Sequence, residues 1–304
     1  MKILINRKPV NGPWGGGNLF LKSFFTTLKE SGHKIITKLE PNIDVIFIMN
    51  PRYDQLGISI NEALNYKKIN PGVKIIQRIN DCDARKNTSN VDAMLIECSK
   101  YIDATIFVSN WMKKYFMDIG WSCDKNFVLF NGVATTENIA KKIQNNKINL
   151  VTHHWSDNYL KGFDVYDFLD NYVKENDKYT FTYIGRERGT FNNTKIISPL
   201  RGQNLLFELQ KYDVYVSASR FDPGPNHILE AISCGLPMLI HSDGGGTVEF
   251  GASKSQENIF KNFDDLIDKL TNQKFQKSCF EVVNWKSSML QLNNIIEEVV
   301  HGQK

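Results

Sequence analysis

Cysteine is scarce in this chain and is never placed as in a metal or disulfide motif. The five cysteines among 304 residues are odd in number, scattered, and never spaced as Cys-x-x-Cys. This pattern excludes a zinc ribbon and a disulfide framework, and it favours a reducing compartment, so we expect a cytoplasmic protein. No apolar run reaches the roughly 18 residues of a membrane-spanning helix, and residues 1–6 are too short an apolar start for a signal peptide.

An excess of charge of one sign is also missing. Lys and Arg number 37 against 33 Asp and Glu, and the net charge of +4 supports a nucleic-acid-binding surface only weakly, so we expect no nucleic-acid partner. Hydrophobic residues make up 41% of the chain and charged residues 23%, which is ordinary globular usage with enough apolar residues for a large core. At roughly 100 to 200 residues per domain, the length predicts two domains.

Short β-rich runs alternate with helical patterns along the whole chain. The alternation predicts βα units with mainly parallel sheets, and the continuously apolar runs are typical of strands covered by helices on both faces. The chain turns polar from Ala134 to Asn146 and strand signals restart at Ile148. We therefore predict an α/β fold of two Rossmann-like parallel-sheet domains facing a cleft, with the boundary at residue 146. The predicted strands are Lys2–Ile5, Val45–Met49, Lys74–Ile79, Ala104–Val108, Phe127–Phe130, Ile148–Thr152, Tyr179–Ile184, Val214–Val216 and Pro237–Ile240.

A glycine-rich segment, residues 12–18, lies between the first strand and a helix pattern that ends near Gly32. It contains Gly15, Gly16 and Gly17. Backbone without side chains before a helix N-terminus lets amide groups close on an anion or a sugar hydroxyl, although a turn without a ligand is the alternative. The segment matches neither Gly-x-Gly-x-x-Gly nor the Lys-containing P-loop, which argues against a Rossmann dehydrogenase.

The most informative stretch runs from Asp213 to Glu249. A strand leads into the loop Pro223-Gly224-Pro225, followed by a helix from Asn226 to Cys234 that stops at Gly235. Proline suits the first turn of a helix, and the amides there predict a seat for a diphosphate at the positive end of the helix dipole. The residues of this seat are Gly224, Asn226, His227 and Ile228.

Two acids flank the start of that helix. Asp222 precedes it and Glu230 lies one turn inside it, eight residues later. An acid in the loop could hold sugar hydroxyls, while an acid on the helix could accept both hydrogen bonds of a ribose diol. The alternative for such polar residues after strands is that they are caps and turns.

This ordered segment resembles the retaining glycosyltransferase family 4, which has the GT-B fold. Asp222 and Glu230 are similar to that family's two acids separated by seven residues, with Asp where Glu is usual. Residues 231–237 are similar to its small-residue helix end and Gly-x-Pro step. Gly244-Gly245-Gly246 followed by Glu249 resembles its Gly-Gly…Glu loop.

The resemblance extends over nearly the whole chain. Lys161-Gly162 resembles the family's Lys-Gly, whose Lys meets the donor diphosphate, and Gly185-Arg186 resembles the strand end near the nucleotide base. Gly15 to Gly17 resemble the glycine loop over the donor, and residues 284–300 resemble a terminal helix that crosses back to the first domain. The implied domains are an acceptor-side domain at 1–146, a nucleotide-sugar-binding domain at 147–283 and the returning helix at 284–304.

The resemblance implies a retaining glycosyltransferase that moves a sugar from a nucleotide diphosphate-sugar to an acceptor hydroxyl on a glycan, a lipid-linked molecule or a small molecule. It implies a catalytic set of Lys161, Asp222 and Glu230, no metal or other cofactor, and no protein nucleophile. Retention in this family is described as same-face attack, in which the leaving phosphate oxygen takes the acceptor proton. A nucleotide-sugar or glycan binding protein of the same fold, without turnover, is the alternative.

Two departures from the family pattern concern charge. Most members place an Arg about five residues before the Lys, but residues 155–160 contain none. At about 4 Å and an effective dielectric of about 20, one such charge is worth roughly 4 kcal/mol against the leaving group. The His that many members carry after the third strand is also absent, and residues 78–81 read Arg-Ile-Asn-Asp there. The candidates to replace the missing charge are Arg186, Arg188 and Arg220.

Three further features have open interpretations. Asp81 and Asp83, spaced as Asp-x-Asp after a strand, could chelate a divalent cation with donor phosphates, Asp81 alone could contact the acceptor, or both could belong to a solvated turn. His153 could line the cleft on the acceptor side or be a capping and packing residue. The aromatic residues Trp111, Tyr115 and Trp121 flank Lys113 and Lys114. This pattern is typical either of a peripheral membrane contact or of an amphipathic helix with a solvated basic side.

Overall fold

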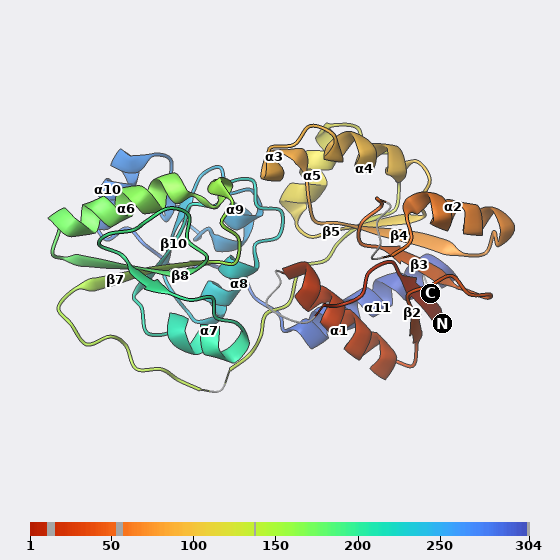
Figure 1. Cartoon of the computed structure of the whole chain (residues 1–304), viewed down its shortest axis with the longest axis horizontal. Helices are drawn as coiled ribbons and strands as arrows, with labels where there is room; N and C mark the ends of the chain where they lie inside the picture. The colour runs from red at the N-terminus through yellow and green to blue at the C-terminus, as the bar shows by residue number, and fades with distance from the viewer. Residues whose placement is uncertain (11–15, 53–56, 137, 303–304) are drawn as a thin grey trace. The chain divides into compact units, whose positions relative to one another are not determined.

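The computed structural model describes residues 1–10, 16–52, 57–136 and 138–302 (Figure 1). The chain forms two compact units. One consists of Met1–Gly132 with Trp285–Lys304, and the other of Val133–Asn284. The polar segment 134–146, after which the sequence predicts the boundary, hydrogen-bonds within the second unit, since the Ile143 amide donates to the Lys211 carbonyl at 3.0 Å.

The first unit is a parallel sheet with helices on both faces. Alternate residues of its strands face two apolar clusters. One cluster packs against α1 (Gly16–Glu30) and α11 (Trp285–His301), and the other against α2 (Ile60–Ile69), α4 (Val91–Ser99) and α5 (Asn110–Asp118). Within the described residues the strand order is β2 (Lys34–Ile36), β1 (Lys2–Ile5), β3 (Val45–Ile48), β4 (Lys74–Ile79), β5 (Ala104–Phe107) and β6 (Asn126–Val128), and the short helix α3 spans Asp83–Lys86.

The last helix belongs to the first unit, as predicted. Met289, Leu292 and Ile296 on α11 are fully buried in the same cluster as Phe20 and Phe24 of α1. Figure 1 shows α11 and α1 side by side beneath the sheet. The first unit is therefore built from two segments of chain that are separated by the whole second unit.

The second unit has a second parallel sheet. Its strand order is β12 (Ile259–Phe260), β11 (Met238–His241), β10 (Val214–Ser217), β7 (Ile148–His154), β8 (Tyr179–Gly185) and β9 (Lys195–Ile197). Phe163, Tyr166 and Leu169 of α6 pack with Leu266 and Leu270 of α10 in one buried cluster on this sheet. The helical segments are η1 (Tyr159–Lys161), α6 (Phe163–Glu175), α7 (Gly202–Leu209), α8 (Asn226–Ser233), α9 (Gly246–Gly251) and α10 (Phe263–Thr271).

The order of strands reverses between β7 and β10. The chain runs outward from β7 through β8 to β9, then returns to the other side of β7 and continues through β10 to β12. Open α/β sheets bind ligands at such a switch point, beyond the carboxyl ends of the strands, because the adjoining loops diverge there. The residues that follow β7 and β10 are therefore the expected position of a ligand site.

All nine predicted strand segments form strands, and the α/β class with two parallel sheets is confirmed. Prediction missed β2, β9 and β12, which are two or three residues long and lie at the edges of their sheets. Strands this short have too few residues to show a period. In the described part of the chain, no helix is both long and apolar enough to cross a membrane.

Candidate active site

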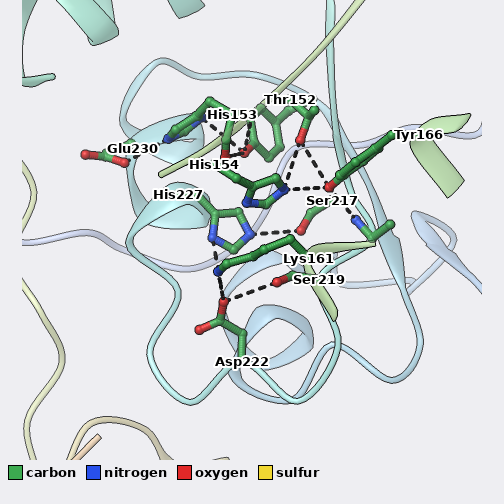
Figure 2. Close-up of polar contacts among 12 residues, drawn as sticks. Thr152, His153, His154, Lys161, Tyr166, Ser217, Ser219, Asp222, His227 and Glu230 are labelled. Atoms are coloured by element: carbon green, nitrogen blue, oxygen red, sulfur yellow. Dashed lines mark hydrogen bonds and ion pairs between the residues drawn. The ribbon is translucent and has the colours of Figure 1, made fainter. Parts of the chain in front are cut away.

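A buried ion pair lies beyond the carboxyl ends of β7 and β10 (Figure 2). Lys161, the last residue of η1, places Nζ 2.6 Å from Oδ2 of Asp222 in the loop between β10 and α8. Their side chains are 13% and 8% exposed, so the pair has far less contact with water than a surface ion pair. The same carboxylate oxygen accepts the hydroxyl of Ser219 at 3.2 Å. These contacts fix the Asp222 carboxylate and keep a lysine cation beside it.

The second predicted acid is held by a histidine. Oε2 of Glu230 on α8 lies 2.9 Å from Nε2 of His153, the penultimate residue of β7. Because a carboxylate only accepts, Nε2 of His153 is the donor, and Nδ1 of the same ring lies 3.1 Å from the Tyr215 hydroxyl. Burial raises the pKa of Tyr215 well above its usual value, so the hydroxyl keeps its proton. The chain Tyr215, His153, Glu230 thus sets the orientation of the acid.

Two further histidine rings fill the space between these pairs. His154 Nε2 lies 2.6 Å from the Tyr166 hydroxyl, and this hydroxyl also accepts the Ala218 amide at 3.1 Å. His227 Nε2 lies 2.9 Å from Oγ of Ser217, while its Nδ1 is 4.0 Å from Oδ2 of Asp222. The rings of His154 and His227 are 4.8 Å apart and inclined at 66°. Figure 2 shows this buried polar layer between the acid pairs and Tyr166.

The glycine loop after β11 supports Asp222 through its backbone. The amide of Asp222 donates to the Gly244 carbonyl at 3.1 Å, and the Gly246 amide donates to the Asp222 carbonyl at 2.8 Å. A Cβ on Gly246 would lie 2.7 Å from the Pro223 carbonyl oxygen, closer than real Cβ contacts, so only glycine allows this approach. The Gly-Gly-Gly segment is therefore a support for the acid loop.

Gly185 ends β8 and Arg186 follows it directly, as the resemblance implies for a strand end. Gly185 pairs in register with His154 and has φ of +146°, and a Cβ there would lie 1.9 Å from the His154 carbonyl oxygen. The guanidinium of Arg186 stacks 4.4 Å from the centre of the Trp155 ring, and that of Arg188 lies 5.7 Å from the Tyr159 ring. Both arginines are exposed, and both contact aromatic residues of the segment that leads to Lys161.

Arg220 differs from those two arginines in having a carboxylate partner. It binds Asp164 with two parallel hydrogen bonds of 2.8 and 2.7 Å. The hydrogen bond with Asp164 raises the pKa of Arg220, and together with the arginine charge it outweighs burial and lowers the pKa of Asp164. In the described part of the chain, neither Arg186 nor Arg188 makes an ion pair. Of the three candidates, Arg220 is therefore the one whose charge is already balanced.

The predicted helix start is present. α8 begins at Asn226 with Pro225 as its N-cap residue, and His227 and Ile228 are buried. The amide of Ile228 donates to the Pro225 carbonyl at 3.1 Å, so it is engaged inside the helix. Gly224 lies in the loop directly before Pro225, next to the Asp222 and Pro223 carbonyls that Gly246 approaches. Lys161, Asp222, His153 and Glu230 thus surround the first turns of α8.

The other predicted site residues lie in the first unit. Gly15 is outside the described residues, while Gly16 and Gly17 begin α1. Asp81 forms an ion pair with Lys86. The carboxylate of Asp83 accepts the amides of Val91 and Asp92, both at 3.0 Å, at the start of α4.

These contacts give Asp83 a structural role. Its two oxygens are used to join α3 to α4, and the hydroxyl of Tyr115 donates to Asp92 at 2.5 Å in the same cluster. The described residues contain no group of three or more His, Cys, Asp or Glu that could hold a metal ion. The aromatic residue at 115, which the sequence left open as a membrane contact, is tied to the α4 helix.

Sequence reasoning missed the tyrosines behind the site. Tyr166 and Tyr215 are fully buried, and their hydroxyls hold His154 and His153. A signal for them was available, because a tyrosine inside a buried strand or helix face needs a polar partner for its hydroxyl. The pairing of Lys161 with Asp222, across 61 residues, carried no local signal.

No family model matches the sequence, and no curated protein matches it. Solved structures match it over the full length. HepE of Anabaena in complex with UDP-glucose has a TM-score of 0.67 and 15% identity, with all of both chains covered. The two-sheet architecture and these matches agree. The chain has the GT-B fold.

Two more GT-B structures show the same similarity. Sucrose-phosphate synthase of Thermosynechococcus elongatus has a TM-score of 0.69 and 11% identity, with 99% of each chain covered. WaaG, a glycosyltransferase involved in lipopolysaccharide biosynthesis, has a TM-score of 0.63 and 13% identity over 99% of this chain and 100% of WaaG. At identities this low, the matches establish a shared fold and no more.

Proposed function

We propose that this chain is a metal-independent, retaining glycosyltransferase that moves a sugar from a nucleotide diphosphate-sugar to an acceptor hydroxyl. The observation that carries the proposal is the buried Lys161–Asp222 pair at the switch point of the second sheet, next to the start of α8. A cation and a helix N-terminus stabilise an anionic leaving group, and a carboxylate beside them binds sugar hydroxyls.

The lysine would act on the leaving diphosphate. An ammonium group has three N–H donors, so Lys161 could keep its bond to Asp222 and still donate to a phosphate oxygen. Negative charge grows on the diphosphate as the glycosidic bond breaks, and donors fixed in advance at that point lower the barrier directly. Asp222, held by Ser219 and by the Gly244–Gly246 backbone, would orient the sugar.

Glu230 would bind the ribose of the donor. A carboxylate has about four lone-pair positions, so Glu230 could accept both from His153 and from the ribose hydroxyls. The imidazole bond holds one oxygen in place, which leaves less side-chain entropy to lose on binding. His153 is then a positioning residue of the donor site, and the acceptor-side role that the sequence offered for it becomes the alternative.

The second positive charge would come from Arg186 or Arg188. Both follow β8 and contact the rings of Trp155 and Tyr159, in the segment where the family pattern has its arginine. Neither is neutralised by a carboxylate in the part of the chain described. Arg220 is a weaker candidate because Asp164 already binds both of its terminal nitrogens.

No protein nucleophile is needed in the proposed reaction. The acceptor hydroxyl would attack on the same face from which the diphosphate departs, and its proton would pass to the leaving phosphate oxygen. Retention of the anomeric configuration follows from this geometry. The chain contributes binding, orientation and charge stabilisation.

A sugar-release assay tests the proposal. The purified full chain is incubated with UDP-, GDP- and ADP-sugars, with and without a chelator, and NMR follows the released nucleotide and the anomer formed. UDP-sugars come first because HepE was solved with UDP-glucose. We expect turnover of one nucleotide class, retained configuration and no effect of the chelator.

The matched variants are Glu230→Gln and Glu208→Gln. Glu208 lies on α7 and pairs with Lys211, outside the site. We expect Glu230→Gln to lose donor turnover and Glu208→Gln to keep it.

The same assay decides between transfer and binding alone. The absent arginine favours the second candidate, a nucleotide-sugar binding protein without turnover. A nucleotide at 100 times its dissociation constant should stabilise the fold by about 2.7 kcal/mol. Thermal stabilisation by a nucleotide with no hydrolysis or transfer of any sugar would favour the binding protein. If no nucleotide stabilises the fold and no sugar is turned over, both functions are refuted.

A further inference from the structure

The first unit contains a buried arginine that has no acidic partner. Arg78 is the penultimate residue of β4 and is 3% exposed. Its Nη2 donates to Oδ1 of Asn131 at 2.8 Å, and the guanidinium carbon lies 4.2 Å from the centre of the Phe20 ring on α1. Within the described residues, Nη1 has no hydrogen-bond partner and no carboxylate lies within ion-pair distance of the group.

This arginine remains a cation in the protein. Burial lowers the pKa of Arg78 to about 9, which is still above neutral pH. Burying a charge without a counter-charge costs several kcal/mol, and a neutral amide with the face of an aromatic ring returns only part of that cost. A buried leucine or methionine would suit the apolar side of this sheet better, so the fold alone does not explain the arginine.

The position of Arg78 is that of a ligand contact. It lies at the carboxyl end of a parallel strand, beside the first turns of α1, whose 15 residues give a helix dipole with its positive end there. A planar guanidinium is suited to a carboxylate or a phosphate, which it binds with two parallel hydrogen bonds.

We propose that Arg78 binds an anionic group of the acceptor, a carboxylate or a phosphate. The inference rests on the proposed function. There, Lys161 and α8 of the second unit hold the donor, so Arg78 of the first unit is available to the acceptor. The acceptor class is then a uronic acid, a phosphorylated sugar or another phosphate-bearing hydroxyl compound. Because Nη1 is closed to solvent, anion binding at Arg78 requires a local opening of the site.

Thermal unfolding of the full chain tests the inference with defined probes. Glucose 6-phosphate and glucuronate represent the two anionic acceptor classes, glucose is their neutral counterpart, and UDP reports on the donor site. We expect at least one anionic sugar at millimolar concentration to raise the melting temperature of the wild type, with no effect of glucose. Arg78→Gln should abolish that shift and keep the shift caused by UDP.

Two more variants control for charge and folding. Lys22 lies on the exposed face of α1, so Lys22→Gln removes one positive charge from the same region and should keep both shifts. Arg78→Lys keeps the charge but loses the planar pair of donors, and its shift should be reduced. The UDP shift of Arg78→Gln also shows that this variant is folded.

The outcomes separate the two proposals. An anion shift that persists in Arg78→Gln, or a wild type that responds to neither anionic sugar, overturns the anion site. Loss of the UDP shift in a folded Arg78→Gln assigns the arginine to the donor diphosphate and overturns its acceptor role. A wild type that responds to no nucleotide refutes the glycosyltransferase proposal, whatever the anionic sugars do.

Discussion

The carboxyl edges of the two sheets differ in the polar groups at their switch points. In the second unit the charged groups have partners within the protein: Lys161 pairs with Asp222, Glu230 hydrogen-bonds to His153 and Arg220 binds Asp164. In the first unit the polar group at the switch point between β1 and β3 is a neutral amide, Asn6. Both units have the same kind of sheet, so the difference lies in the side chains.

The two groups have different roles, because Asn6 joins two loops of its own unit. The side chain of Asn6 donates to the carbonyls of Asn50 and Ile58 at 2.6 and 2.9 Å and accepts the Met49 amide at 2.7 Å. These bonds join the loops that follow β1 and β3. The Lys161–Asp222 pair of the second unit instead keeps a cation beside a carboxylate, at the position where we propose that the diphosphate-sugar binds.

Among these variants, Lys161→Ala should have the largest effect, a loss of turnover at the second-unit site. Removal of one donor to a developing anion typically lowers turnover by about 100-fold to 1,000-fold. We expect a loss of this size in kcat for the preferred donor. Lys274→Ala is the matched control, because Lys274 pairs with Asp268 at a half-exposed surface site.

The ion pair itself calls for a stability control on that variant. Lys161→Ala leaves the buried Asp222 carboxylate without its cation, so circular dichroism and the melting temperature must accompany the kinetics. A folded Lys161→Ala with turnover near that of Lys274→Ala would show that this pair is structural, like Asn6.

Asn6→Ala should affect stability and leave donor binding intact. The substitution leaves three half-buried backbone groups without their Asn6 partner, and we expect the free energy of unfolding of the first unit to fall by about 3 kcal/mol. Tryptophan fluorescence in urea follows this unit, since it contains every tryptophan except Trp155.

The exposed residue Asn61 gives the matched control, Asn61→Ala, which should unfold like the wild type. The thermal shift with UDP should keep its size in both variants. Loss of that shift in Asn6→Ala would mean that the first-unit edge takes part in donor binding.

His153→Phe tests whether this histidine orients Glu230 for donor binding. The hydrogen bond to Glu230 connects a ring to a charged group, and such bonds contribute about 1.5 kcal/mol or more. We expect the donor KM to rise about tenfold with a smaller change in kcat, because Glu230 loses its orientation. A rise in acceptor KM alone would restore the acceptor-side interpretation of His153.

The smallest effect is expected from pH. Burial, with the neighbouring Arg220, lowers the pKa of His241 in the folded chain, so the unfolded chain binds this proton first as pH falls. Stability contributed by the neutral ring is therefore lost below about pH 6.5. Urea unfolding followed by fluorescence in a background that keeps Trp155 as its sole tryptophan should show a steeper loss of stability toward low pH with His241 than with His241→Gln. Parallel losses in the two proteins would contradict this assignment.

The strands of both sheets were predictable because buried parallel strands are continuously apolar in sequence. The edge strands β2 and β9 were not, since each has only three residues, too few to show a period. Site residues on ordered motifs, such as Glu230 and Lys161, were identifiable by type and position.

The partners of those site residues were not predictable. His153 holds Glu230 from 77 residues away, and Tyr215 completes that chain from the middle of another strand. Such contacts are decided by which strand lies beside which, and this information resides in the topology of the sheet.

The return of α11 to the first unit has a consequence for biosynthesis. The second unit is one continuous segment, Val133–Asn284, and can collapse as soon as it leaves the ribosome. The first unit, although synthesised earlier, lacks the buried residues Met289, Leu292 and Ile296 until the last helix emerges. The apolar face of α1 that they cover therefore stays exposed during most of translation, so nascent chains should depend on chaperones at the first unit in particular.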